Sequence, residues 1–152
     1  MVIVLKKEII INNLDEMYNL GNQIGRLVKP NMVITLTGNL GVGKTTLTKA
    51  IAKGLGITKV VNSPTFTILK IYLGRLTLNH LDVYRIKGDD DFELEEYFYN
   101  GGVSVIEWGE NISQLLPQKT LDIRILNLGG SSRQVILTGI DEYKDLIAEV
   151  VL

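Results

Sequence analysis

The chain contains no cysteine, one histidine (His80) and three prolines among its 152 residues. Without cysteine it has no disulfide, no thiol nucleophile and no thiolate metal site, and a single histidine rules out a multi-histidine metal cluster. The formal net charge is −1, so no overall positive field attracts nucleic acid. Any contact with RNA must therefore be local or go through a partner.

Long hydrophobic runs are missing as well. The N-terminal stretch MVIVLKKEIII is interrupted by Lys6 and Lys7 and is too short for the apolar region of a secretory signal. No stretch approaches the roughly 20 apolar residues of a membrane span. With 45% hydrophobic and 22% charged residues, the composition is that of an ordinary globular protein. We therefore expect a single domain over residues 1–152, located in the cytoplasm and without membrane contact.

Strand and helix patterns follow one another along the chain. Residues 2–11 have a strand pattern, and residues 32–37 and 103–108 are nearly continuous apolar runs, typical of strands buried on both faces of a sheet. Hairpins are expected around Gly74-Arg75 and around the GGSS stretch. Helices are expected over residues 14–28, over 44–55 and from about 141 to the end.

The first expected helix has a recognisable start. Asn13 can cap it, and Glu16 occupies the capping-box position three residues later. Its apolar residues recur at helical spacing and predict one buried face. These residues are Leu14, Met17, Leu20, Ile24, Leu27 and Val28.

The stretch from Gly38 to Thr45 matches the phosphate-binding pattern G-x-x-x-x-G-K-[ST] without a mismatch, between an expected strand and an expected helix. The glycines allow backbone N–H groups to turn toward phosphates, and the helix directs its positive end at the same anion. In this pattern Lys44 reaches the β- and γ-phosphates and the Thr45 hydroxyl binds Mg²⁺. The sequence therefore predicts a nucleotide-binding α/β fold: a P-loop NTPase-like three-layer sandwich with a mixed parallel and antiparallel sheet.

Two carboxylates are candidates to complete a magnesium site. Asp82 and Glu107 each follow an apolar strand pattern, and the C-terminal ends of strands form the crevice in which open α/β sheets bind ligands. The alternative is that either residue is simply a solvated charge at a strand end. A magnesium site without an acidic partner is unusual, so we expect at least one of them in the site.

Several neighbouring residues allow two interpretations. Thr65, in the segment NSPTFT (62–67), is a candidate for sensing the γ-phosphate, although the segment also fits a proline-anchored turn. We interpret His80 as a structural hydrogen-bond partner rather than a catalyst. Trp108 is interpreted as core rather than as a ligand stack. The acidic run Asp89–Glu96 is interpreted as a solvated helix start rather than a docking surface.

The motifs GNLGVGKTTL, SPTFT, HLDVYR and IEWGE, in this order, resemble the TsaE (YjeE-type) family. These are ATP-hydrolysing accessory proteins of bacterial tRNA threonylcarbamoyladenosine synthesis, and the resemblance covers nearly the whole chain. It implies ATP or ADP and Mg²⁺ as cofactors. It also implies TsaD and TsaB as partners, with tRNA contacted only indirectly through their complex.

The resemblance also implies a role for each matching position. The start of the first helix, at Leu14, borders the adenine in the family's pattern. The phosphates are bound by Gly38, Gly41, Val42, Gly43, Lys44, Thr45 and Thr46. The metal ligands implied are Thr45 and Glu107, with Asp82 at the second acidic position, and Thr65 lies in a switch-like loop. The candidate catalytic residues are Lys44, Thr65, Asp82 and Glu107.

Three other functions are alternatives to ATP hydrolysis. A small-molecule kinase needs several arginines over the acceptor and usually a lid, but the five arginines are scattered and no lid-sized insertion is visible. A GTPase needs the N-K-x-D pattern, which is absent. A non-hydrolysing, nucleotide-dependent docking protein stays open. Because no arginine near the glycine loop is an obvious arginine finger, we expect slow intrinsic turnover that partner proteins stimulate.

Overall fold

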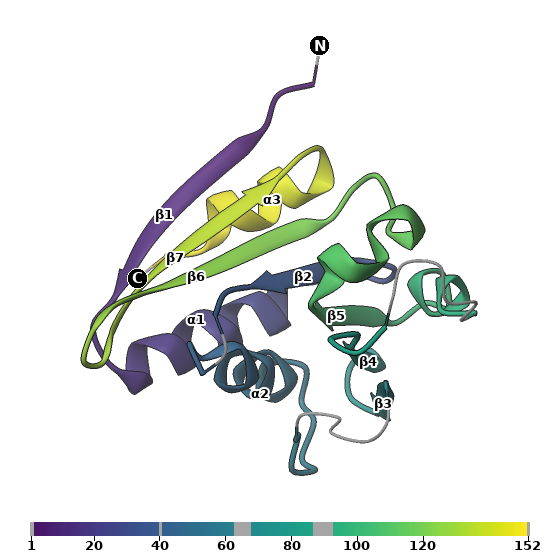
Figure 1. Ribbon diagram of the computed structural model, residues 1–152, viewed down its shortest axis with the longest axis horizontal. Coiled ribbons are helices and arrows are strands. Elements are labelled where there is room, and N and C mark those ends of the chain that lie inside the picture. Colours follow the sequence, from purple (N-terminus) through teal and green to yellow (C-terminus); the bar gives the residue numbers. More distant parts are fainter. Residues whose placement is uncertain (1, 40, 63–67, 87–92, 152) are drawn as a thin grey trace.

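The computed structural model describes residues 2–39, 41–62, 68–86 and 93–151. Within them one sheet of seven strands has the order β1-β7-β6-β2-β5-β4-β3 (Figure 1). The strands are β1 (Leu5–Ile11), β2 (Val33–Thr37), β3 (Leu69–Tyr72), β4 (Leu78–Asp82), β5 (Val103–Glu107), β6 (Leu121–Gly129) and β7 (Ser132–Gly139). The helices are α1 (Leu14–Leu27), α2 (Lys44–Gly54) and α3 (Glu142–Glu149), with the 3₁₀ helices η1 (Glu95–Phe98) and η2 (Gly109–Leu115).

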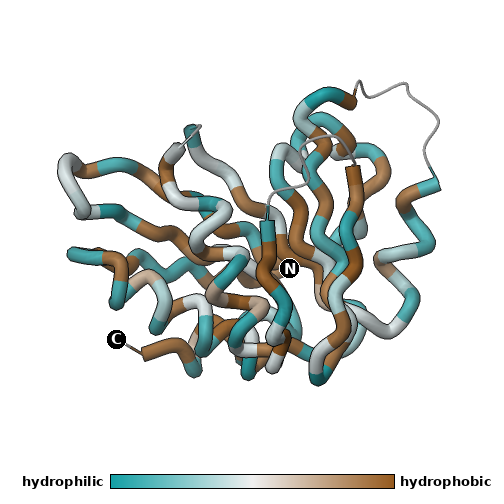
Figure 2. The backbone as a smooth tube through the Cα atoms, turned by 90° about the horizontal axis from the view of Figure 1, so that it is seen from below, coloured by the Kyte–Doolittle hydropathy of each residue, from teal (hydrophilic) through white to brown (hydrophobic). Residues whose placement is uncertain are grey.

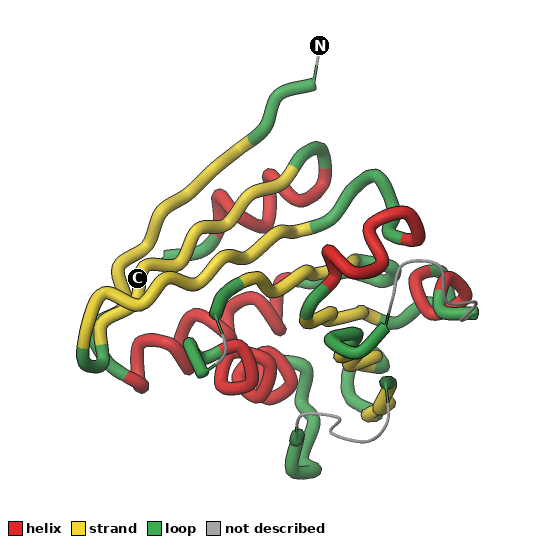
Figure 3. Tube along the Cα trace, viewed as in Figure 1, coloured by secondary structure: helices red, strands yellow, loops and turns green. Residues whose placement is uncertain are grey.

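The sheet is part parallel and part antiparallel, as predicted. Strands β4, β5, β2 and β6 pair in parallel, whereas β3 pairs with β4, and β7 with both β6 and β1, in antiparallel fashion. Figure 3 shows the three long strands β1, β7 and β6 side by side, next to the shorter strands of the parallel part. The expected hairpins are β3–β4 and β6–β7. The predicted α/β class with a mixed sheet is confirmed.

Two layers cover the parallel part of the sheet. Residues such as Ile34 and Val105 pack against α1 and α2 on one face. Their chain neighbours Val33 and Ile106 point to the opposite face, where they pack with Phe98 of η1 and with other apolar residues near η1 and η2. Burial on both faces requires nearly continuous apolar runs in these strands, and Figure 2 shows how hydrophobic and hydrophilic residues are distributed along the chain. No helix in the described parts of the chain is long and apolar enough to cross a membrane.

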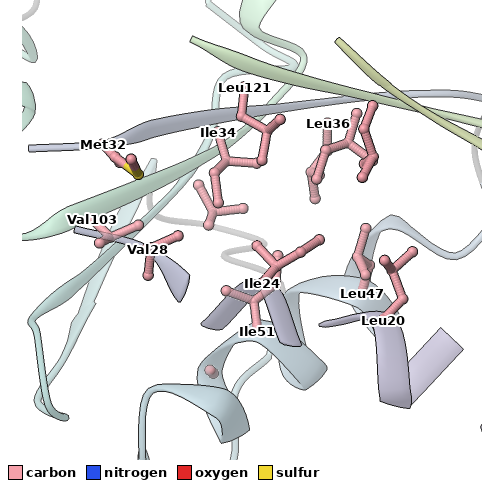
Figure 4. Close-up of a cluster of buried hydrophobic side chains, with 14 of the residues drawn as sticks. Leu20, Ile24, Val28, Met32, Ile34, Leu36, Leu47, Ile51, Val103 and Leu121 are labelled. Atoms are coloured by element: carbon pink, nitrogen blue, oxygen red, sulfur yellow. The ribbon is translucent and has the colours of Figure 1, made fainter. Parts of the chain in front are cut away.

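Helices α1 and α2 lie against one another beneath β2, and this packing fixes the helix that follows the glycine loop. Figure 4 shows Leu20 and Ile24 of α1 and Leu47 and Ile51 of α2 directed toward the strands. All four side chains are fully buried. The contact is close because glycines face one another: a Cβ at Gly25 would lie 2.2 Å from the Ile51 carbonyl oxygen and 2.8 Å from the Cα of Gly54.

We expect Gly25→Ala to destabilise the protein, although alanine is the better helix former. The added methyl group meets backbone atoms rather than a flexible side chain, so the two helices must separate, at a cost of about 1–3 kcal/mol. Chemical denaturation measures the change. Asn19→Ala, at an exposed position of α1, is the control and should stay within about 0.5 kcal/mol of the parent. Equal stability of the two variants would contradict the packing described.

Three details differ from the sequence predictions. Strand β1 begins at Leu5, not at residue 2. The Asn13 side chain accepts from the Glu16 N–H at 2.9 Å, as predicted, but the Glu16 carboxylate accepts from Asn12 rather than from Asn13. Leu14 is 58% exposed, so the buried face of α1 begins at Met17. Leu14 is the first residue of α1.

Candidate nucleotide-binding site

The glycine loop joins β2, a central strand, to the first turn of α2. Gly41 and Gly43 have φ angles of 79° and 120°, which residues other than glycine rarely adopt. Gly43 is the N-cap of α2, and no side chain caps the helix. The N–H groups of its first turn are therefore available to an anion, next to the positive end of the helix dipole. This is the geometry that a phosphate-binding loop requires.

Lys44 is the first residue of α2, and only 5% of it is exposed. Its ammonium donates to the carbonyl oxygen of Gly38 at 2.9 Å. The same Nζ lies 3.9 Å from the centroid of the Trp108 ring, a cation–π contact. These two contacts hold the charge of Lys44 directly over the glycine loop.

Asp82 and Glu107 lie next to one another at the C-terminal ends of β4 and β5. The two strands pair in parallel with these residues in register, and Glu107 is in turn the partner of Leu36 in β2. Both carboxylates therefore reach the edge of the sheet from which the glycine loop emerges. Glu107 is buried, with 3% exposed, whereas Asp82 is partly exposed.

A cavity of about 230 Å³ brings the predicted residues together. It is lined by Gly41, Gly43, Lys44, Thr45, Thr46, Asp82, Glu107 and Trp108. One hydroxyl and two carboxylates are the oxygen ligands that Mg²⁺ prefers, and Mg²⁺ usually takes few protein ligands because phosphates and waters supply the rest. No group of three or more acidic, histidine or cysteine side chains suited to a metal occurs in the described part of the chain. The donor set at Thr45, Asp82 and Glu107 therefore fits magnesium bound together with a phosphate.

His80 is fully buried, and its Nε2 lies 2.8 Å from Oε2 of Glu107. Because an ionised carboxylate only accepts, Nε2 carries the proton and donates it. The interpretation of His80 as a hydrogen-bond partner is confirmed. Its partner is one of the two candidate magnesium ligands, which the sequence alone did not indicate.

The interpretation of Trp108 as a core residue is wrong in part. One side of the ring packs on the apolar cluster around Ile106 and Ile112, but the ring also lines the cavity and faces the Lys44 ammonium. Trp108 has a φ of 64°, which is uncommon for a residue with a large side chain. Tyr84 packs against it with ring centroids 4.8 Å apart. The tight turn after β5 thus directs the ring toward the glycine loop.

A second cavity, of about 350 Å³, lies beside the same loop. Asn13 and Leu14 at the start of α1 line one side of it, and the β6–β7 turn at Gly130 and Ser131 lines another. Leu14, the predicted neighbour of the base, is exposed and borders this cavity. Gly41, Gly43 and Thr46 line both cavities, whereas Val42 lines only this one of the two.

The structure also places an arginine at the glycine loop, where none was predicted. Arg133 of β7 lines the second cavity, and its Nε donates to the Val42 carbonyl oxygen at 2.9 Å. The strand alternation of Arg133 with Val135 and Leu137 was a signal that this side chain faces inward. It did not indicate which loop the side chain meets there.

Two sequence interpretations concern residues outside the described ranges. Thr65 and its segment belong to residues 63–67, so the structure does not place this candidate phosphate sensor. Of the acidic run Asp89–Glu96, only its last four residues are described, and Glu95 and Glu96 open the 3₁₀ helix η1.

The sheet, the glycine loop and the placement of the two carboxylates define a protein with a P-loop NTPase-like α/β fold. The model of one family, described as "Threonylcarbamoyl adenosine biosynthesis protein TsaE", matches residues 11–135. This match covers most of the chain, and the chain belongs to the TsaE family.

Individual relatives agree with this assignment. The tRNA threonylcarbamoyladenosine biosynthesis protein TsaE of Bacillus subtilis is 47% identical over 123 residues, which cover 80% of this chain and 78% of that protein. The protein of the same name from Treponema pallidum is 44% identical over 118 residues, 76% of this chain and 87% of its own. The crystal structure of Bacillus subtilis YdiB superposes with a TM-score of 0.83 at 40% identity, covering 98% of this chain and 95% of that one.

Proposed function

We propose that this protein binds and hydrolyses Mg-ATP as an accessory to the threonylcarbamoyladenosine modification of tRNA. The observation that carries the proposal is the cavity in which Lys44 and Thr45 of the loop meet Asp82 and Glu107. The pathway rests on membership of the TsaE family and on the printed names of the relatives.

Each residue of the cavity has a task in this proposal. The loop N–H groups and the start of α2 bind the phosphates, and Lys44 supplies the positive charge at the β- and γ-phosphates. Thr45 and Glu107, the latter oriented by His80, hold Mg²⁺, with Asp82 beside them. The metal neutralises charge that develops on the phosphate oxygens during transfer.

Asp82 is the better placed of the two carboxylates to meet a water molecule. One of its oxygens accepts from the Tyr84 N–H at 3.0 Å, and the residue is partly exposed, whereas Glu107 is buried against His80. We therefore propose that Glu107 would hold Mg²⁺ and that Asp82 orients the attacking water.

The nucleotide is expected to be ATP or ADP rather than GTP, because the chain lacks the guanine-reading pattern. At a ligand concentration near 100 times its dissociation constant, binding stabilises the fold by about 2.7 kcal/mol. For a chain of this length this raises the melting temperature by about 5–10 °C. Thermal-shift measurements with ATP, ADP and GTP, each with Mg²⁺, check the expectation. A larger shift with GTP than with ATP would overturn it.

Turnover tests the proposed function as a whole. We propose that the partners are TsaD and TsaB and that tRNA is met only through their complex. The isolated protein should release phosphate more slowly than about 1 s⁻¹ at saturating Mg-ATP, because no arginine is among the described residues that line the cavity around Lys44 and Thr45. Excess TsaD–TsaB complex should raise the rate severalfold or more, by ordering the site and excluding water. Fast hydrolysis that ignores the partners would contradict the accessory role, and no hydrolysis with them would favour a docking protein.

A further inference from the structure

Arg133 is the only charged residue of β7; it is partly buried, and it shares a face of the strand with the buried residues Val135 and Leu137. Its register partners are Ile11 of β1 and Asn127 of β6, and Ile11 is almost fully buried. A charged side chain in such a position needs hydrogen-bond partners to compensate for lost hydration. The hydrogen-bond partners of the Arg133 side chain indicate its role in the structure.

The guanidinium group donates to four oxygen atoms in two separate segments. Its Nε binds the Val42 carbonyl of the glycine loop at 2.9 Å. Its Nη1 binds the β6–β7 hairpin, at the carbonyls of Gly130 (2.8 Å) and Ser132 (2.9 Å) and at the Asn127 side chain (3.1 Å). None of the ion pairs between described residues involves Arg133. The guanidinium therefore binds three backbone carbonyls and one side-chain amide oxygen, and forms no ion pair with a carboxylate of the described residues.

The bond to Val42 sets the direction of one peptide group of the loop. Because the peptide is planar and trans, the Gly43 N–H points opposite to the Val42 carbonyl, and thus away from the guanidinium. Gly43 and Gly41 on either side of Val42 have positive φ angles, and nothing lies within 4 Å of a Cβ built at Gly41. The buried Val42 side chain anchors this part of the loop in the core, and the hydrogen bond from Arg133 fixes the direction of the peptide group that joins Val42 to Gly43.

The bonds to the hairpin set the other side of the same nucleotide site. Gly130 and Ser131 line the larger cavity together with Asn13 and Leu14. One planar guanidinium therefore holds both the β6–β7 hairpin, which lines the larger cavity, and the glycine loop, which lines the smaller one. Its forked donors can satisfy carbonyls in two directions at once, which a lysine ammonium does less well because it is a compact point charge on a flexible stem.

We propose that Arg133 is a positioning residue that fastens the phosphate-binding loop to the β6–β7 hairpin, so that the larger cavity beside Leu14, proposed for the base, and the smaller cavity around Lys44, proposed for the phosphates, form one preorganised site. This inference rests on the proposed nucleotide binding. It assigns Arg133 to the binding of the diphosphate part of the nucleotide and not to the chemical step, where an arginine finger would act.

The test compares Arg133→Gln and Arg133→Lys with the parent protein. The chain contains one tryptophan, and because Trp108 lines the phosphate cavity, its fluorescence reports binding of Mg-ADP and Mg-ATP. We expect both variants to bind both nucleotides about 10-fold more weakly or worse, while kcat at saturating ATP stays within about threefold of the parent. Arg26→Gln removes the same charge from the exposed last turn of α1 and should bind like the parent.

The other outcomes are each decisive. Parent-like affinity in Arg133→Gln, or full affinity in Arg133→Lys, would overturn the proposal, the latter because charge alone would then suffice. A fall in kcat of about 10³-fold would overturn it in favour of an arginine finger. If Arg133→Gln does not fold, Arg133→Lys carries the test. Absence of nucleotide binding by the parent protein would instead refute the proposed function itself.

Discussion

Replacing Glu107 by glutamine is expected to abolish ATP turnover while leaving most of the binding of ADP. Glutamine keeps the shape of the side chain and an oxygen that can accept from His80 Nε2, so the fold should survive. The negative charge proposed to hold the metal is lost, and removing one preorganised electrostatic group of this kind lowers kcat by about 10²–10³. Phosphate release at saturating Mg-ATP measures the rate, and calorimetry with ADP measures the binding that remains.

Asp82→Asn provides the companion test within the same cavity. If Asp82 orients the attacking water, its loss should also abolish turnover, but it should change the Mg²⁺ dependence of nucleotide binding less than Glu107→Gln does. The matched control for Glu107→Gln is Glu149→Gln. It makes the same substitution at an exposed position near the end of α3 and should leave turnover unchanged. Parent-like turnover in either cavity variant would remove that residue from the proposed site.

The parts of the fold that sequence predicted are those governed by local pattern. The apolar runs of β2 and β5 predicted buried strands, and the glycine pattern predicted the loop and the start of α2 at Lys44. The proximity of Asp82 and Glu107 also followed, because both were assigned to the C-terminal ends of strands and parallel strands bring such ends to one edge.

The parts that sequence did not predict depend on contacts between distant segments. Arg133 meets Val42 across 91 residues, and alternation along β7 gave only the face of the sheet. Trp108 was assigned to the core because its aromatic character fits both environments, and only the left-handed turn after β5 directs it toward Lys44. Capping of α1 by the Asn13 side chain was predicted. The Glu16 carboxylate accepts hydrogen bonds from Asn12 rather than from the Asn13 N–H, because its side chain reaches past the capping residue.

Lys44→Ala is expected to weaken ADP and ATP binding strongly while the fold survives. The ammonium is held over the loop by the Gly38 carbonyl and the Trp108 ring, so it can meet the β-phosphate without a large rearrangement. A charge-assisted contact of this kind contributes about 1.5–3 kcal/mol, which corresponds to about a 10- to 100-fold loss of affinity. Calorimetric titration with Mg-ADP measures the change.

Two comparisons separate a lost phosphate contact from a damaged loop. AMP has no β-phosphate, so its weaker binding should change little in Lys44→Ala if the loop keeps its shape. Lys44→Met retains an unbranched apolar stem against Trp108 but no charge, and it should bind ADP as poorly as the alanine variant. Lys53→Met, the same change at an exposed position in the last turn of α2, should bind like the parent. Unchanged ADP affinity in Lys44→Ala would refute the role of this ammonium at the phosphates, and a restored affinity in Lys44→Met would assign the effect to packing on Trp108 instead of charge.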